Sequence, residues 1–530
     1  MKLTRLTALV LALAMALSMV SMASAEEKPS TWISDELVEI TIMRDENPSQ
    51  IVTTDNIKLQ TIEELLNVRI IVEAPPKASY TDKKATRIAT DDMPDIMLVD
   101  FTTDVMTYAD DGMFVNLSDY RDQMPNLFAL LDSNPSCATV TINGDYYHAP
   151  SLQRVNPDAR RSGQLINIRT DLLEKYNIPT PTTWDELHDA ILTIQQNEPG
   201  MVGFTNRKGG STTGTRKMLD CMAYPLGSGS TMYYDEDLGG VWVYGPAHEN
   251  FKAVLTYLNK CYESGVLDPD YAIMTKDLWT EKLSSGRAIC TIDNDGVVRN
   301  FNVALQTVDP SAEIGIIPTL TNSLGQTRNT YYTEDKITSA WVISASSEHI
   351  DVCVKFLDWC YSEQGTDVNG YGKEGVTFDY VDGHPVLKEE VMAKYAANGS
   401  TAAYDLQSAL GIGLLDISPR YDTGAENQME LYMMGSEEAV AEYKAKLANI
   451  VNDTNLRAPV TSPALTLEQA ERYNELLVAV ENIIWQEVDK YITGQEPIEN
   501  WDKVMEKARK AGAEEMEKIY NDAWAALQGK

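Results

Sequence analysis

The chain has 530 residues, with 79 Asp and Glu against 44 Lys and Arg, which gives a formal net charge of −35. Hydrophobic residues make up 43% and charged residues 23%, a composition typical of a globular protein and not of a disordered one. An acidic surface repels phosphate backbones and anionic lipid heads, and the sequence holds no basic cluster to offset it. We therefore expect no nucleic-acid partner and no docking to an anionic membrane surface.

The N-terminus has the three parts of a cleavable export signal. Lys2 and Arg5 form a positive region, residues 9–17 are apolar, and residues 23–25 read Ala-Ser-Ala. We expect residues 1–25 to be removed as a signal peptide. An uncleaved membrane anchor is the alternative, but a spanning helix needs ~20 apolar residues and this apolar stretch is shorter. The first cysteine is Cys137, so we expect an extracellular or cell-envelope protein without a lipid anchor on an N-terminal cysteine.

The first elements alternate between strand and helix. Residues 37–43 alternate as a strand, 56–66 form a helix, 68–72 form a second strand and 96–99 form a short buried strand. This rhythm is typical of a parallel α/β sheet.

The middle and end of the chain continue with a strand at 165–169 and several amphipathic helices. Thr183 and Glu186 have the spacing of a capping box, which predicts the start of a helix. Periodic apolar residues predict further helices, at 249–264, 350–361, 467–492 and 500–527. Residues 202–217 contain Gly-Gly-Ser-Thr-Thr-Gly-Thr and read as a flexible loop.

The six cysteines are too few for a fold built on disulfides. Cys353 and Cys360 lie seven residues apart on a predicted helix, about 10 Å along its axis, which is too far for a bridge. We interpret most of the six as small core residues.

Common catalytic and cofactor motifs are missing. The sequence has no Gly-x-Ser-x-Gly, no Walker loop and no complete Gly-x-Gly-x-x-Gly. Residues 293–296 and 235–237 resemble starts of calcium loops, but neither is followed by Glu at the twelfth position, so we read both as solvated turns. We expect no cofactor and no metal. With 79 acidic residues, a carboxylate pair for glycoside hydrolysis stays open.

Tyrosine is abundant, with 26 Tyr and 9 Trp against 8 Phe. Tyr and Trp combine an apolar ring with a polar group, which suits a sugar's C–H face and its hydroxyls. A tolerant surface residue is the alternative reading for any single Tyr.

Short segments in a characteristic order resemble the extracellular solute-binding proteins of ABC importers, family 1. The segments are Asp92–Ile96, Gly112–Tyr120, Gly144–Pro150, Ile168–Leu172, Pro181–Leu187 and Tyr257–Pro269. Gly370–Gly375 and Tyr491–Asp502 are similar to the large oligosaccharide-binding branch with LplA-like and alginate-binding proteins. Some relatives carry a calcium loop after the helix that begins at Trp184, and here Gln196–Gly203 departs from it.

The resemblance implies an α/β, two-lobe periplasmic-binding-protein-like fold with a hinge and a central ligand cleft. We expect lobe 1 to begin with residues 26–155 and to resume at 336–420. Lobe 2 would hold residues 156–335 and be completed by a helical segment at 421–530. The expected function is capture of a carbohydrate, namely an oligosaccharide, by hinge closure and its delivery to ABC permease subunits by a monomer. A secreted polysaccharide-degrading hydrolase or lyase is the alternative.

Ligand-binding candidates are polar and aromatic residues near strand ends, where clefts of α/β folds form. They are Arg44, Asp100, Phe101, Tyr108, Arg160, Tyr224, Trp279, Asp293 and Asn294. The alternatives are a surface ion pair for Arg44, a cap for Asp100 and core packing for Trp279.

The resemblance adds Tyr371 and Glu374, in a segment whose glycines allow a sharp turn. Tyr371 would offer a ring to a sugar from a loop that faces the cleft, and Glu374 would accept hydrogen bonds from hydroxyls. A plain glycine-rich turn with Glu374 paired to Lys373 is the alternative.

Overall fold

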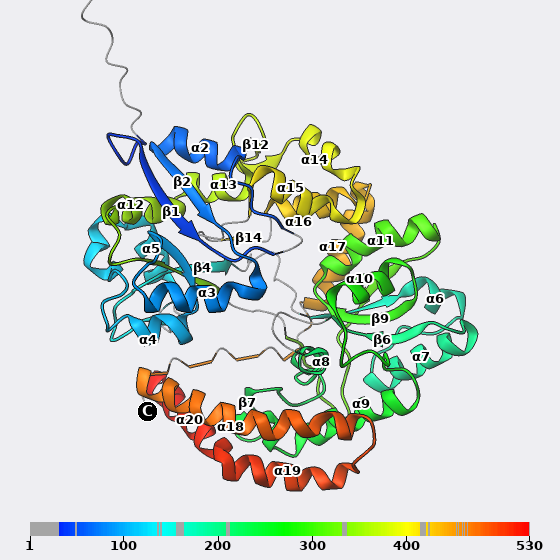
Figure 1. The fold of residues 1–530 in the computed structure, drawn as a ribbon. Coiled ribbons are helices and arrows are strands. Elements are labelled where there is room, and N and C mark those ends of the chain that lie inside the picture. Colours follow the sequence, from blue (N-terminus) through cyan, green and yellow to red (C-terminus); the bar gives the residue numbers. More distant parts are fainter. Residues whose placement is uncertain are drawn as a thin grey trace, which may run out of the picture.

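The structure is a computed structural model. It describes residues 31–528 except 48–49, 135–136, 138–139, 155–163, 208–212, 331–335, 414–419, 422–423, 452, 454, 458, 461 and 464. Two sheets with their helices form two lobes, which lie at the upper left and at the lower right of Figure 1.

The sheet of lobe 1 has, in the described part of the chain, six strands in the order β14-β4-β11-β3-β1-β2. Their bounds are β1 Val38–Met43, β2 Val68–Glu73, β3 Ile96–Val99, β4 Ala149–Arg154, β11 Lys336–Ile343 and β14 Arg420–Tyr421. β1 runs parallel to β2 and β3, β11 runs antiparallel to β3 and β4, and β14 runs parallel to β4. The carboxyl ends of β1, β2, β3, β4 and β14 therefore share one edge with the start of β11.

Helices cover both faces of this sheet. Ile40 and Ile42 of β1 point to a core shared with α2 (Ile57–Leu66), α5 (Pro125–Ser133) and α12 (Ile350–Cys360). Met43, Met97 and Val99 point to the opposite core, shared with α3 (Lys77–Ala89) and with the helical turns η1 (Phe101–Val105) and α4 (Met106–Tyr108). The alternation of side chains along each strand thus produces a three-layer lobe.

The sheet of lobe 2 has the order β10-β5-β9-β6 among the described residues. Its strands are β5 Leu165–Arg169, β6 Val202–Thr205, β9 Ala288–Asp293 and β10 Ile314–Ile317. Leu165 pairs with Asp293, Ile166 with Ile317, and Thr205 with Thr291. The start of β5 and the carboxyl ends of β6, β9 and β10 therefore meet at one edge.

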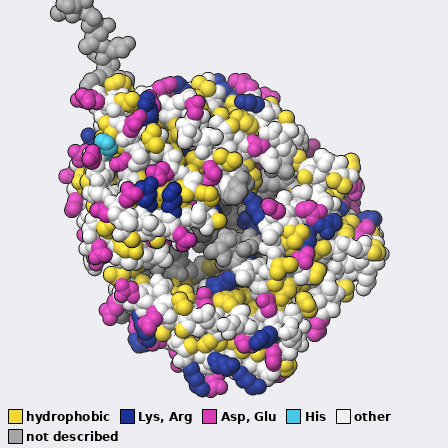
Figure 2. All heavy atoms as spheres, in the orientation of Figure 1, with side chains coloured by type: hydrophobic (Ala, Val, Ile, Leu, Met, Phe, Trp, Pro, Cys, Tyr) yellow, Lys and Arg dark blue, Asp and Glu magenta, His cyan; other side chains and the backbone are white. Residues whose placement is uncertain are grey.

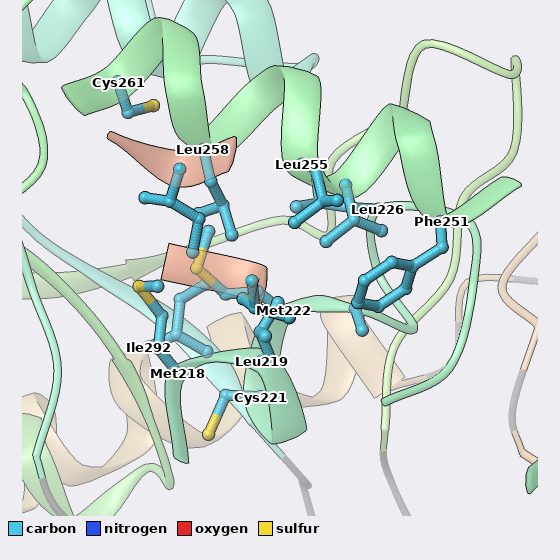
Figure 3. Packing of buried hydrophobic residues seen from close by; sticks show 14 of the residues in the cluster. Met218, Leu219, Cys221, Met222, Leu226, Phe251, Leu255, Leu258, Cys261 and Ile292 are labelled. Carbon is cyan, nitrogen blue, oxygen red and sulfur yellow. The ribbon is translucent and has the colours of Figure 1, made fainter. Parts of the chain in front are cut away.

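The two faces of the lobe 2 sheet also carry separate cores. One core is shared with α6 (Thr170–Lys175), α7 (Trp184–Asn197), α8 (Gly214–Met222) and α9 (Asn250–Glu263). Figure 3 shows side chains of α8, such as Met218 and Met222, packed against Leu255 and Leu258 of α9. The other core is shared with α10 (Lys276–Ser284), α11 (Gly296–Val308) and α17 (Glu437–Val451).

The C-terminal helices extend lobe 2. They are α18 (Leu467–Ile492), α19 (Trp501–Ala508) and α20 (Glu514–Leu527), with the π-helical turn η7 (Arg509–Ala513) between the last two. They pack against α9 and against the hairpin of β7 (Met232–Asp235) and β8 (Val241–Tyr244). The ring of Trp501 lies 5.5 Å from that of Phe251 in α9.

A further group of elements contacts both lobes. It contains α13 (Glu363–Tyr371), the hairpin β12 (Phe378–Val381) and β13 (His384–Leu387), α14 (Glu389–Ala396), α15 (Ala402–Leu410) and α16 (Ala425–Tyr432). Lys373 pairs with Glu64 of α2 at 2.5 Å on the lobe 1 side. Glu430 of α16 accepts hydrogen bonds from Arg299 at 2.7 Å and Asn300 at 2.9 Å, both on α11 of lobe 2.

Local sequence signals are largely confirmed. The predicted capping box forms at Thr183 and Glu186, and a second forms at Thr466 and Gln469. All six cysteines lie among the described residues, all are buried, and none of them forms a disulfide. Within the described residues, no helix is long and apolar enough to cross a membrane.

Two local predictions were wrong. The segment 202–217, predicted as a flexible loop, begins with β6, which gains its pairing from the distant strand β9, and ends within α8, while its residues 208–212 lie outside the described residues. The turns at Asp235 and Asp293 are not solvated at those residues, which are 0% and 2% exposed. Asp235 instead accepts hydrogen bonds from the Tyr233 hydroxyl and from two following backbone N–H groups.

Candidate functional site

The two sheet edges described above are joined by the passages of the chain between the lobes. The chain leaves lobe 1 at the end of β4 and enters lobe 2 at the start of β5. It returns to lobe 1 at the start of β11, and it leaves β14 again for α17 of lobe 2. The carboxyl ends of most strands therefore point toward the region between the lobes, and Figure 2 shows that this face of the molecule is hollowed there. Ligands of open α/β sheets bind beyond such strand ends.

On the lobe 1 edge, the predicted residues Arg44, Asp100, Phe101 and Tyr108 follow β1 and β3. Arg44 donates to the backbone carbonyl of Asp45 at 2.7 Å and forms an ion pair with the Asp45 carboxylate at 3.5 Å. Phe101 and Tyr108 pack, half-buried, in the core beneath this edge. Asp100 does not cap its helical turn through its side chain.

Asp100 belongs to an ion cluster that fixes the turn after β3. The Lys84 ammonium, only 3% exposed, contacts the carboxylate of Asp100 at 2.6 Å and that of Asp104. Burial lowers the pKa of Lys84, but hydrogen bonds and the charges of the two carboxylates outweigh it, and the pKa rises overall. The Asp100 side chain is 71% exposed, so it remains accessible from solvent at the edge.

His148 lies beneath Phe101 and was not predicted. Its ring is fully buried, its centroid lies 5.2 Å from that of Phe101, and neither ring nitrogen has a hydrogen-bond partner. Burial lowers the pKa of His148 to about 3, so the imidazole is neutral at ordinary pH.

On the lobe 2 edge, the structure brings Trp279 and Asp293 together with Arg207, which sequence reasoning missed. The Arg207 guanidinium pairs with the Asp293 carboxylate, with a second contact at 3.0 Å, and its carbon lies 5.8 Å from the Trp279 ring centroid. Arg207 follows the end of β6, so recognising that short strand would have found it. Asn294 is exposed next to this pair, and its side-chain oxygen accepts from the Gly296 backbone at 3.0 Å.

Trp279 is a core residue at this edge. It is 4% exposed, its Nε1 donates to Thr291 at 3.0 Å, and its ring packs edge-to-face on Phe301 at 5.1 Å. The structure thus matches the core-packing alternative for Trp279, and its role toward a ligand stays a prediction.

Lys276 and Tyr404 connect this edge with α15. The Lys276 ammonium lies 5.3 Å from the Tyr404 ring centroid. Burial, followed by the positive charge of Arg207, lowers the pKa of Lys276. Lys276 and Arg207 thus bring two cations close together at this edge, where Asp293 is paired with Arg207.

Tyr224 lies apart from Trp279, beside Arg328. The guanidinium carbon of Arg328 is 5.3 Å from the Tyr224 ring centroid, and burial raises the pKa of Tyr224 to about 12. Arg328 was not predicted, since it lies in an irregular segment without a strand or helix signal. Arg160 lies outside the described residues.

The expected placement of Tyr371 was wrong. Tyr371 is the last residue of α13, is 5% exposed and packs against Phe378 at 5.7 Å, because the hairpin β12–β13 folds over it. It is not a loop residue facing an open cleft. Glu374 is exposed, and Lys373 pairs with Glu64. The ligand-binding roles of Tyr371 and Glu374 stay predictions.

Among the described residues, no group of three or more His, Cys, Asp or Glu side chains could hold a metal ion.

Two α/β lobes joined by several passages, with strand ends turned toward a common hollow, are the arrangement of two-lobe binding proteins. The chain belongs to the bacterial extracellular solute-binding protein family, whose model matches residues 59–368. This confirms the resemblance seen in the sequence motifs.

Individual relatives are similar over nearly the whole chain. The polygalacturonan/rhamnogalacturonan-binding protein YtcQ of Bacillus subtilis (strain 168) is 24% identical over 480 residues, which cover 88% of this chain and 87% of YtcQ. Lipoprotein LipO of the same organism is 22% identical over 482 residues, or 87% of this chain and 88% of LipO.

Solved structures share the fold. The alginate-binding protein AlgQ2, solved without calcium ion, superimposes with a TM-score of 0.77 at 19% identity, covering 94% of this chain and 100% of that one. The S. pneumoniae ABC-transporter substrate binding protein FusA, in complex with kestose, has a TM-score of 0.70 at 17% identity, covering 93% and 99%. The α/β two-lobe fold expected from the sequence is therefore confirmed.

Proposed function

We propose that this solute-binding protein captures an oligosaccharide between its lobes and delivers it to the permease of an ABC transporter. The observation that carries the proposal is that Asp100 and Phe101 lie at one sheet edge and Arg207 and Asp293 at the other, and that this face of the molecule is hollowed between the lobes. Charged groups can bind sugar hydroxyls, and half-buried rings suit the C–H faces of a pyranose. The names of YtcQ, AlgQ2 and FusA, which cite polysaccharides and kestose, support the same class of ligand.

The mechanism we propose is hinge closure. The passages between the lobes connect two bodies with separate cores, so one lobe can rotate against the other without repacking either core. A ligand that contacts both edges stabilises the closed state by its differential affinity for it. Closure would then present a liganded surface to the permease.

We further propose a binding role without catalysis, because the family is one of binding proteins. The described edges also hold their carboxylates in ion pairs. Asp100 is bound by Lys84, and Asp293 is bound by Arg207. Each of these carboxylates already has a cationic partner within the protein, whereas glycoside cleavage uses two carboxyl groups that flank the scissile bond.

Export is proposed on the same basis. The family is extracellular, so we propose that residues 1–25 act as the removable signal and that the mature protein is a monomer in the cell envelope. LipO is named a lipoprotein, whereas this chain has no cysteine before Cys137.

A thermal-shift screen tests the proposal. Mature protein is heated with neutral and acidic oligosaccharides, and a ligand at 100 times its Kd adds about 2.7 kcal/mol to the free energy of unfolding. We expect at least one glycan to raise the melting temperature and to titrate at one equivalent in calorimetry. A micromolar Kd in that titration would correspond to a binding free energy of about −8 kcal/mol.

The same mixtures are assayed for reducing ends and for unsaturated products. Steady accumulation of either would support the secreted enzyme instead. Absence of any thermal shift across oligosaccharides of both charge classes would contradict the proposed ligand class.

A further inference from the structure

A pocket opens at the lobe 2 sheet edge, beside the start of β5. Its polar lining is Gln164, Trp184, Thr319, Arg328 and Asn329, and its apolar lining includes the ends of β9 and β10. The pocket is narrow, with room for about one water molecule or one small polar group, and it is partly open to solvent. Because it lies at the start of β5 and at the ends of β9 and β10, it belongs to the same edge as Arg207 and Asp293.

The pocket contains buried donors without acceptors. Arg328 is 2% exposed, and its Nε and Nη1 have no hydrogen-bond partner. The indole Nε1 of Trp184, in the same lining, is also buried without a partner. Each unmet buried donor costs about 1–3 kcal/mol, and a charged donor costs more.

The charge of Arg328 is only partly compensated by the protein. Its Nη2 lies 3.5 Å from Oδ2 of Asp237, a long contact. The same carboxylate oxygen accepts from Arg457 at 2.8 Å and from Gln326. Asp237 is therefore engaged mainly by Arg457.

Aromatic rings hold the guanidinium in place. Its carbon lies 5.3 Å from the Tyr224 ring centroid and 5.9 Å from that of Tyr233. Stacking of this kind restrains a guanidinium while leaving its N–H groups free to donate in the ring plane. The site is thus preorganised, with its donors fixed before any ligand arrives.

We propose that this pocket receives one carboxylate oxygen of an acidic sugar unit that lies at its open side, so that the ligand of this protein is an acidic oligosaccharide. The inference rests on the proposed function and deepens it. A carboxylate accepts hydrogen bonds through both oxygens and carries a negative charge that balances the positive charge of Arg328. A sugar hydroxyl can accept a hydrogen bond, but it leaves the positive charge of Arg328 uncompensated. Arg328 selects the ligand, and Trp184 supplies a neutral donor beside it.

The test compares one oligosaccharide with its ester. Calorimetry measures binding of trigalacturonate and of fully methyl-esterified trigalacturonate to the wild-type protein, with trimannuronate as a second uronate. We expect at least one of the two uronates to bind, and trigalacturonate, where it binds, to bind at least tenfold more tightly than its ester. For trimannuronate the same ratio is taken against its own methyl ester. Equal affinity for acid and ester, or no binding of either uronate, overturns the inference.

Variants locate the effect. Arg328→Met keeps the length of the side chain and removes the charge, and we expect it to bring the acid-to-ester ratio close to one. Arg328→Lys should retain part of the preference. The control is Arg472→Gln on exposed α18, where Arg472 pairs with Glu515, and it should keep the wild-type ratio. A preference that persists in Arg328→Met overturns the inference.

The melting temperature without ligand shows whether each variant is folded. If Arg328→Met does not fold, the wild-type ester comparison and Arg328→Lys decide the question. Binding of neutral oligosaccharides only, such as kestose or xylotriose, would leave the proposed function standing and overturn the carboxylate pocket. Failure of all glycans would overturn both.

Discussion

His148 makes the stability of lobe 1 sensitive to acid, and replacing it by Leu should remove that sensitivity. The ring is fully buried without a hydrogen-bond partner, and burial lowers its pKa from 6.5 to about 3. Between about pH 3 and pH 6.5, His148 is therefore protonated in the unfolded chain but stays neutral in the folded protein. The neutral form contributes its full stability above pH 6.5, and that stability is lost as the pH falls toward 3.

The size of the effect follows from the two pKa values. The gap between about 3 and 6.5 corresponds to roughly 5 kcal/mol once the pH is below both. At pH 5 the unfolded state gains about 2 kcal/mol from protonation, and at pH 7.5 it gains almost nothing. Between these two pH values, the wild-type protein should lose about 2 kcal/mol more than His148→Leu does.

Urea unfolding of both proteins at pH 7.5 and pH 5.0 measures this difference directly. Other groups titrate in the same range, but they are common to the two proteins and cancel in the comparison. His384→Gln is the matched control, because His384 is an exposed histidine on β13, and its stability should follow the wild type. An equal loss in wild type and His148→Leu would show that the imidazole is charged or partnered in the folded protein, and would refute the reasoning.

Three further outcomes are expected. Asp293→Asn should lower the free energy of unfolding by about 2–3 kcal/mol. This is less than the roughly 3–5 kcal/mol typical of breaking a buried ion pair, because the Arg207 side chain is 32% exposed. In urea melts, the double variant that adds Arg207→Met should recover most of the lost stability. Thr183→Ala should cost about 1 kcal/mol by removing the acceptor for the Glu186 N–H, and an unchanged melting curve would contradict the role of the cap. N-terminal sequencing of secreted protein should read Glu26 first, and recovery of Met1 from membranes would overturn the export prediction.

Sequence patterns predicted those parts of the fold that local chemistry decides. α7 and α18 begin at capping boxes, where one hydroxyl and one side chain three residues later satisfy free backbone N–H groups. β6 escaped prediction because Val202–Thr205 is short and its pairing comes from β9, more than eighty residues away. The glycine-rich composition after it favoured a loop, and nothing local opposed that reading.

The candidate site shows the same division between local and distant causes. The positions of Asp100 and Asp293 at the sheet edges were predicted because polar residues at or just after the end of a strand lie at that edge, and this rule needs only the strand itself. Tyr371 was misplaced because its burial depends on a hairpin that packs back over α13, which no spacing in the segment reveals.

Arg328 shows even more clearly why part of the candidate site could not be predicted from the sequence. Its partners, Tyr224 and Asp237, lie about a hundred residues earlier in the chain, and its unmet donors are defined only when the pocket has formed. A residue of this kind has no sequence signal of its own, because the feature that makes it a binding group is that two of its buried donors, Nε and Nη1, lack acceptors within the protein. The rule that ligands bind beyond the ends of strands locates the edge of a binding site from the sequence. Only the structure shows which buried donor at that edge has no acceptor within the protein, and that donor is the group to which a ligand must offer an acceptor.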